Sequence, residues 1–173
     1  MDILYTVEEK YLQAIDELNY GELPKALHLF NEIIISEPGY ARAYYQLGYL
    51  YYYQFKDYQA AGYYFKKCIE LEKAFPEVYE HYLKLLITLK MHKSITQIAE
   101  SALEVPGVCK ANIYESLGLY AEELQNFDLA KAQYTLASLA TSCQADHSTY
   151  EEHLKRVTHK LRINDRVRYT YQG

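Results

Sequence analysis

One pattern recurs at a fixed distance in this sequence and constrains the fold more than any other feature. A leucine–glycine pair is followed by a turn and then by an alanine with an aromatic residue four positions later. The two leucine–glycine pairs lie 70 residues apart, which is two periods of about 35 residues. Small residues let two helices approach closely, and an aromatic residue fills the remaining gap. The copies are Leu47-Gly48 with Ala61 and Phe65, and Leu117-Gly118 with Ala130 and Tyr134.

Extending this period in both directions predicts four helix–turn–helix units and one further helix. Thr6 and Glu9 form a capping box that opens the first helix, and Ser148 with Glu151 opens the last one in the same way. The third unit carries the pattern weakly, because Tyr82 stands where a small residue is expected. We predict a single domain over residues 1–173, with repeats at about 7–40, 41–74, 75–106 and 111–144, a capping helix at about 148–163, and an extended or mobile tail at 164–173.

The small-residue and aromatic spacing resembles that of the tetratricopeptide repeat, a helix–turn–helix unit of 34 residues. The resemblance covers about residues 7–144 and is carried best by the second and fourth units. It implies an all-α fold, a right-handed superhelical solenoid whose first helices line a concave groove. Such a groove is used to bind a peptide or a helix of a partner protein.

Family resemblance also implies which residues line the groove. In the second repeat these positions hold Arg42 and four tyrosines, on a helix that is apolar nearly all round. Tyrosine suits a surface that is sometimes bare, since its ring gives contact area and its hydroxyl tolerates water. The alternative, that these rings pack only against neighbouring helices, stays open. The predicted partner-binding residues are Tyr11, Ile15, Arg42, Tyr45, Tyr49, Tyr52, Tyr53, Tyr79, Leu83, Leu86, Glu115, Leu119 and Glu122.

The predicted groove changes from aromatic and aliphatic residues to acidic ones along the chain. A matching partner would present two or three apolar anchors followed by a Lys or Arg. The glutamates have an alternative interpretation as an ordinary solvated helix face. Relatives that bind chaperone tails hold a terminal carboxylate with Lys and Asn on the first helix, where this chain has Tyr11 and Ile15. We therefore do not expect binding of an acidic chaperone tail.

Composition excludes several classes of function. The formal net charge is −5, which argues against nucleic-acid binding because that needs a basic surface. The charge is uneven: residues 151–173 carry six Lys/Arg against three Asp/Glu. The first residues lack the pattern of a signal peptide, and no apolar run is long enough to span a membrane. Three widely separated cysteines fit free thiols in a reducing compartment, so we expect a cytoplasmic protein.

The sequence shows no pattern of catalytic, metal-binding or phosphate-binding residues. The six histidines show no metal-ligand spacing, there is no phosphate-binding glycine loop, and Cys68 occupies a position expected in the core. We predict no enzymatic activity, no metal and no cofactor. The leading interpretation is an adaptor or chaperone-like scaffold for a protein or peptide partner. Two alternatives stay open: a homo-oligomerisation module, and a protein similar to bacterial secretion chaperones that holds an apolar segment of a client.

Overall fold

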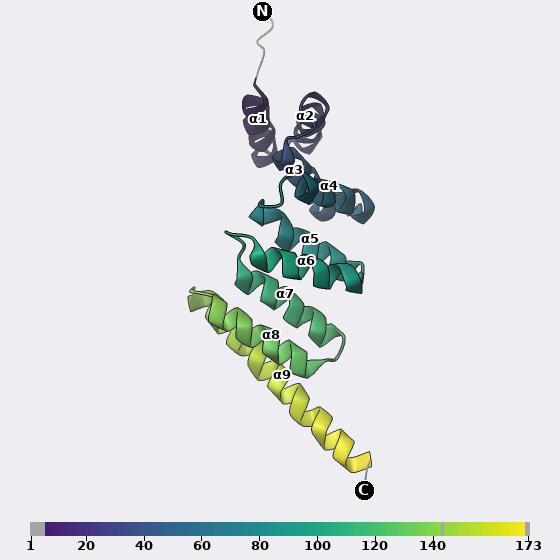
Figure 1. The fold of residues 1–173 in the computed structure, drawn as a ribbon, viewed down its shortest axis with the longest axis vertical. Helices are drawn as coiled ribbons and strands as arrows, with labels where there is room; N and C mark the ends of the chain where they lie inside the picture. Colours follow the sequence, from purple (N-terminus) through teal and green to yellow (C-terminus); the bar gives the residue numbers. More distant parts are fainter. Residues whose placement is uncertain (1–5, 143, 172–173) are drawn as a thin grey trace, which may run out of the picture. The chain divides into compact units, whose positions relative to one another are not determined.

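The computed structural model describes residues 6–142 and 144–171, and over these residues the regular secondary structure is α-helix joined by short turns, with no strand (Figure 1). The predicted all-α fold is confirmed, and each predicted repeat contains two helices. The helices are α1 (Val7–Asn19), α2 (Leu23–Ser36), α3 (Ala41–Tyr53), α4 (Tyr58–Leu71), α5 (Pro76–Thr88), α6 (His92–Glu104), α7 (Lys110–Glu123), α8 (Phe127–Ala140) and α9 (Gln144–Tyr171).

The chain divides into two compact units, Met1–Leu85 and Leu86–Gly173, with the boundary inside α5. Each unit is described by itself below. The predicted single domain and the predicted handedness of the superhelix remain predictions.

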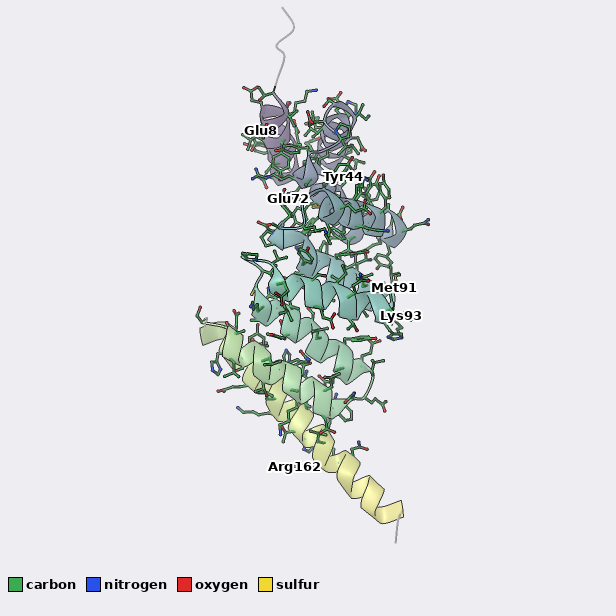
Figure 2. The ribbon with its side chains drawn as sticks, in the orientation of Figure 1. Glu8, Tyr44, Glu72, Met91, Lys93 and Arg162 are labelled. Carbon is green, nitrogen blue, oxygen red and sulfur yellow. The ribbon has the colours of Figure 1, made fainter. Side chains whose placement is uncertain are left out.

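Close approach of α3 and α4 defines the first unit. The apolar side chains of Leu47 and Phe65 are fully buried between these helices. A Cβ atom added to Gly48 would lie 2.5 Å from the Phe65 ring, so only glycine fits there without a shift. Tyr44, labelled in Figure 2, is also buried on α3. The preceding helix pair, α1 and α2, packs in the same manner around Ala14 and Phe30.

In the second unit α7 and α8 meet in the same way. A Cβ atom added to Gly118 would lie 2.6 Å from the ring of Tyr134, which is fully buried. Helix α9 completes this core with Tyr150 and Val157, both buried. The two glycines on which the repeat was predicted therefore serve the same purpose in the two units.

Every turn within a helix pair passes through one residue in the left-handed region. That residue is Gly21 in the first repeat, with φ of 83°. In the other three repeats the residue is Lys56 (φ of 57°), Lys90 (55°) or Gln125 (59°). Residues with a Cβ atom are sterically disfavoured in this conformation. The four positions recur with the repeat, so the turn geometry is a property of the repeat rather than of its residue type.

The first helix begins where it was predicted to begin, but the last helix does not. The Thr6–Glu9 capping box opens α1 as predicted. The predicted box at Ser148 is wrong, because α9 already begins at Gln144 and Ser148 lies inside it. The predicted extended tail is also wrong for residues 164–171, which continue α9. No Pro or Gly interrupts the sequence from Gln144 to Tyr171, so nothing ends the helix near residue 163. Residues 172–173 lie outside the described residues.

Candidate partner-binding surface

Four tyrosines of α3 and a histidine of α5 form one aromatic group in the first unit, called here the tyrosine cluster: Tyr45, Tyr49, Tyr52, Tyr53 and His81. Tyr45, Tyr49 and Tyr53 recur every fourth residue, which places them along one helix face. The centroids of the Tyr49 and Tyr53 rings are 4.5 Å apart. His81 meets both rings edge-on, at 5.2 Å from Tyr49 and 5.5 Å from Tyr53. The tyrosines predicted for the second repeat are thus brought together, with His81 among them.

A hydrogen bond fixes the histidine within this group. The Tyr53 hydroxyl lies 2.9 Å from Nδ1 of His81. Burial lowers the pKa of His81, and it raises the pKa of Tyr53 to about 12 and that of Tyr45 well above its usual range. All three side chains are therefore neutral at physiological pH. All five members are only half-buried, so the cluster presents neutral ring edges and hydroxyls to solvent.

Three other predicted residues of the first unit lie outside the tyrosine cluster. Tyr11 packs edge-on against Tyr40 at 5.6 Å and accepts a hydrogen bond from Gln46. Ile15 packs against the core of the first helix pair. Arg42 is exposed at the start of α3.

The residues predicted on α5 are not available to a partner. Tyr79 and Leu83 are 2% and 0% exposed, and the Tyr79 hydroxyl donates to the carbonyl oxygen of Lys73. Leu86, which begins the second unit, is 2% exposed. The prediction failed because α5 buries a wide apolar face that also includes Val78 and Leu85. The positions that line a groove in the family fall inside this buried face.

The acidic residues predicted for the groove are also already engaged, and the main one is Glu122 of α7. Its side chain is 9% exposed and accepts hydrogen bonds from three side chains. Arg156 of α9 binds both carboxylate oxygens, at 2.9 and 2.8 Å. Lys160 lies at 2.6 Å and the Tyr134 hydroxyl at 2.9 Å. Hydrogen bonds from Arg156, Lys160 and Tyr134 hold the pKa of Glu122 at about 2.

Glu115 of α7 also pairs with a side chain of α9, namely His153. It lies 3.2 Å from Nε2 of His153, and Nδ1 of the same ring lies 2.9 Å from Nη1 of Arg156. Because the guanidinium can only donate, Nδ1 accepts and the proton of this imidazole sits on Nε2, facing Glu115. The glutamates thus pair with side chains of α9, whereas the prediction assigned them to a partner's Lys or Arg. Leu119, between them in sequence, is 47% exposed.

A signal for this pairing was present in the sequence and was missed. Glu115 and Glu122 are separated by seven residues, as are His153 and Lys160, with Arg156 between the latter two. Such spacing places each set on one helix face. Two facing helices with complementary sets are a reasonable prediction of a packed pair.

Two of the three cysteines, Cys68 and Cys109, lie among the described residues. Burial raises the pKa of the Cys68 thiol to about 12, which fits a packing role at the position expected in the core. Cys109 is an exposed free thiol, and Cys143 lies outside the described residues. Among the residues that the structure describes, no helix is long and apolar enough to cross a membrane.

The helices are paired, and in two of the pairs a glycine lies against an aromatic ring. This fold is that of a tetratricopeptide-repeat protein. No model of a known protein family matches the chain, and no curated protein matches it. Solved structures do resemble it. PilW, a type IV pilus biogenesis factor, is 15% identical with a TM-score of 0.70, covering 88% of this chain and 78% of its own.

Two further structures give the same result. Pseudomonas aeruginosa PilF is 16% identical with a TM-score of 0.75, covering 96% of this chain and 73% of its own. MamA of Desulfovibrio magneticus is 20% identical with a TM-score of 0.66, covering 92% and 97%. These neighbours contain tetratricopeptide repeats, and at such identities the likeness shows the fold alone.

Proposed function

We propose that this chain is a non-enzymatic scaffold that binds a peptide or helix of a partner protein on the tyrosine cluster of the first unit. The observation that carries the proposal is the half-burial of four neighbouring tyrosine rings on one helix. A ring that served only the core would be expected to be as buried as Phe65, which is 0% exposed. The tetratricopeptide fold supports the proposal, since family resemblance implies partner binding on the first helices of the repeats.

Chemistry of the cluster suits an apolar partner. Its rings are held by each other and by His81, so little side-chain entropy is lost when a partner covers them. Each fully desolvated apolar anchor could contribute roughly 2 kcal/mol. A requirement for Lys or Arg in the partner is no longer part of the proposal, because Glu115 and Glu122 are engaged by α9.

A double substitution tests the proposal. Tyr49→Ala with Tyr52→Ala should abolish capture of partner proteins in affinity purification with mass spectrometry. The melting temperature should fall by only about 3 °C, as expected for losing about 1 kcal/mol in a chain of this size. Tyr63→Ala is the matched control, since Tyr63 is 60% exposed on α4 outside the cluster. A loss of melting temperature above about 10 °C would assign these rings to the core.

Oligomerisation through the same cluster is tested separately. Light scattering across a dilution series should show monomers when the cluster is a free docking surface. A dimer that persists on dilution and is lost in the double variant would assign the cluster to self-association. A cytoplasmic location and a role like that of secretion chaperones remain predictions.

A further inference from the structure

The tyrosine cluster holds hydrogen-bond donors that its own chain does not use. Among the described residues, the hydroxyl groups of Tyr45 and Tyr49 have no hydrogen-bond partner, and neither hydroxyl is sealed from solvent. Tyr53 and His81 share one hydrogen bond, between the hydroxyl and Nδ1. Whichever atom donates in that bond, the neutral pair keeps one further proton, on Nε2 or on the hydroxyl. Three donors therefore remain on the surface of the cluster.

Acceptors are scarce on the same surface. The backbone carbonyl groups of α3 mostly bond within the helix itself. The cluster contains no carboxylate and no amide side chain, so hydroxyl oxygens and at most one imidazole nitrogen are its only side-chain acceptors. A partner that brought several backbone N–H groups to this surface would leave some of them unpaired, which costs free energy. The surface is therefore complementary to a segment with free carbonyl oxygens and few N–H groups.

Charges beside the cluster favour a neutral partner. Burial is the main cause of the raised pKa of Tyr45, and the carboxylate of Glu77 on α5 adds to it. Glu80 adds in the same way to the raised pKa of Tyr53, although Glu80 also pairs with Lys84 at 2.6 Å. Glu77 is exposed and has no ion pair among the described residues, so it would repel an anionic partner. Neutral carbonyl groups are the acceptors that suit the three donors.

We infer that the segment bound by the tyrosine cluster is extended and proline-rich, an inference that rests on the proposed function of this surface. Proline has no backbone N–H, and a polyproline II segment leaves its carbonyl groups free of internal hydrogen bonds. Its rings pack on aromatic side chains, and its preformed shape loses little entropy on binding. Such a segment brings acceptors to the three donors and adds no N–H group that needs a partner.

The length of the cluster fits a short segment of this kind. Tyr45 and Tyr53 are eight residues apart, which is about 12 Å along a helix. Polyproline II rises 3.1 Å per residue, so about four residues span this distance. A partner helix would cover the same length with apolar side chains, but the carbonyl groups in its interior are already bonded. The three donors would then lose water without gaining acceptors, which disfavours a helix.

Three labelled peptides test this inference with the full chain. The probe is a fluorescein-labelled peptide of about nine L-prolines, and its twin has the same number of D-prolines, which form the mirror-image helix. The third peptide is a helix of about 18 residues with leucines at i, i+3 and i+7. Fluorescence anisotropy should show the L-proline peptide binding about tenfold more tightly than either of the others.

Hydroxyl-deletion variants separate hydrogen bonding from ring contact. Tyr45→Phe with Tyr49→Phe keeps both rings and should weaken binding of the L-proline peptide by about tenfold. The melting temperature should not change, because these hydroxyl groups bond no other described residue. Tyr63→Phe, which removes a hydroxyl outside the cluster, is the matched control and should bind like the natural sequence.

Three results would overturn the inference: equal affinity for the L- and D-proline peptides, no binding of the L-proline peptide up to millimolar concentration, and unchanged binding by the double Phe variant. If only the helical peptide binds, and Tyr49→Ala with Tyr52→Ala abolishes its binding, the inference is wrong while the proposed function stands. If the double Ala variant also captures the same partner proteins as the natural sequence, the proposed function fails as well.

Discussion

The α3–α4 pair and the α7–α8 pair have the same packing but differ by one hydroxyl group. In each, a glycine lets an aromatic ring of the second helix lie against the first. In the first unit this ring is Phe65, and other aromatic rings surround it. The ring centroids of Tyr45, Tyr52 and Tyr82 lie within 6.5 Å of the Phe65 centroid. In the second it is Tyr134, whose hydroxyl donates to Glu122. That hydroxyl joins the core to an ionic group that also holds α9.

The comparison shows how one repeat pattern yields two different surfaces. In the first unit the apolar Phe65 ring lies beside half-buried tyrosines of α3. A ring with a hydroxyl fits beside a carboxylate, and the carboxylate binds the following helix.

Substitution of either glycine should destabilise its own helix pair, by a similar amount in the two units. Gly48→Ala and Gly118→Ala each place a methyl group within 2.6 Å of a buried ring. Overpacking of this kind lowers the free energy of unfolding by up to about 3 kcal/mol. Chemical denaturation should show the loss, and amide hydrogen exchange should confine it to the unit carrying the substitution. Gly39→Ala is the control, because the nearest atom to its added Cβ lies 4.0 Å away.

Removal of the Glu122 charge should affect only the second unit. Glu122→Gln places an amide NH₂ among Arg156 and Lys160, and should cost about 2 kcal/mol of unfolding free energy. The pKa of Glu122 is about 2 in the folded chain and near 4.5 when unfolded. Its stabilisation is therefore present above pH 4.5 and lost as the pH falls towards 2. Unfolding measured between pH 7 and 3 should be flatter in the variant. Equal slopes would contradict the ionic role.

Exchange of the hydroxyl itself is the sharpest test of the comparison. Tyr134→Phe gives the second unit the ring of the first and removes one donor to Glu122. We expect a loss of about 1.5 kcal/mol, because the acceptor is charged. Much of this loss should disappear when Glu122→Gln is already present, which a double-mutant cycle measures. Full additivity would show that the hydroxyl and the carboxylate act separately.

Smallest is the effect expected at the turns. Asp57 and Asn126 cap α4 and α8 through their side chains, whereas Met91 caps α6 without a side-chain hydrogen bond. Met91→Asp should therefore stabilise the chain by about 1 kcal/mol. Thermal denaturation should detect a rise of a few degrees. The same substitution at exposed Leu89 should give no gain, since that residue precedes the cap.

Much of the fold could be predicted because the period is visible in the residues themselves. Two helix contacts can be predicted from residue type and spacing alone: Gly48 with Phe65, and Gly118 with Tyr134. The positions of the turns between these helices follow from the two contacts. The site was predicted only in part. Tyr45, Tyr49, Tyr52 and Tyr53 do gather, because they share one helix face.

Residues that failed as predicted site residues did so for a tertiary reason. Periodicity says which face a residue occupies, but not what covers that face. Tyr79 and Leu83 are buried by packing that local sequence does not reveal. Glu115 and Glu122 are engaged by α9, a helix whose start and length were both misjudged. His153, Arg156 and Lys160 lie within the helix predicted at about 148–163, but its sequence alone does not show that they face α7.

The ion pairs of Arg156 and Lys160 with Glu122 also set the register of α9. Apolar contacts such as those of Val157 and Leu161 would tolerate sliding along the neighbouring helices, because one apolar side chain can replace another. Sliding by one turn, about 5.4 Å, would leave Glu122 facing only one of the two cations, because Arg156 and Lys160 are themselves one helical turn apart. A single buried carboxylate thus fixes the position of a helix of 28 residues along its neighbours.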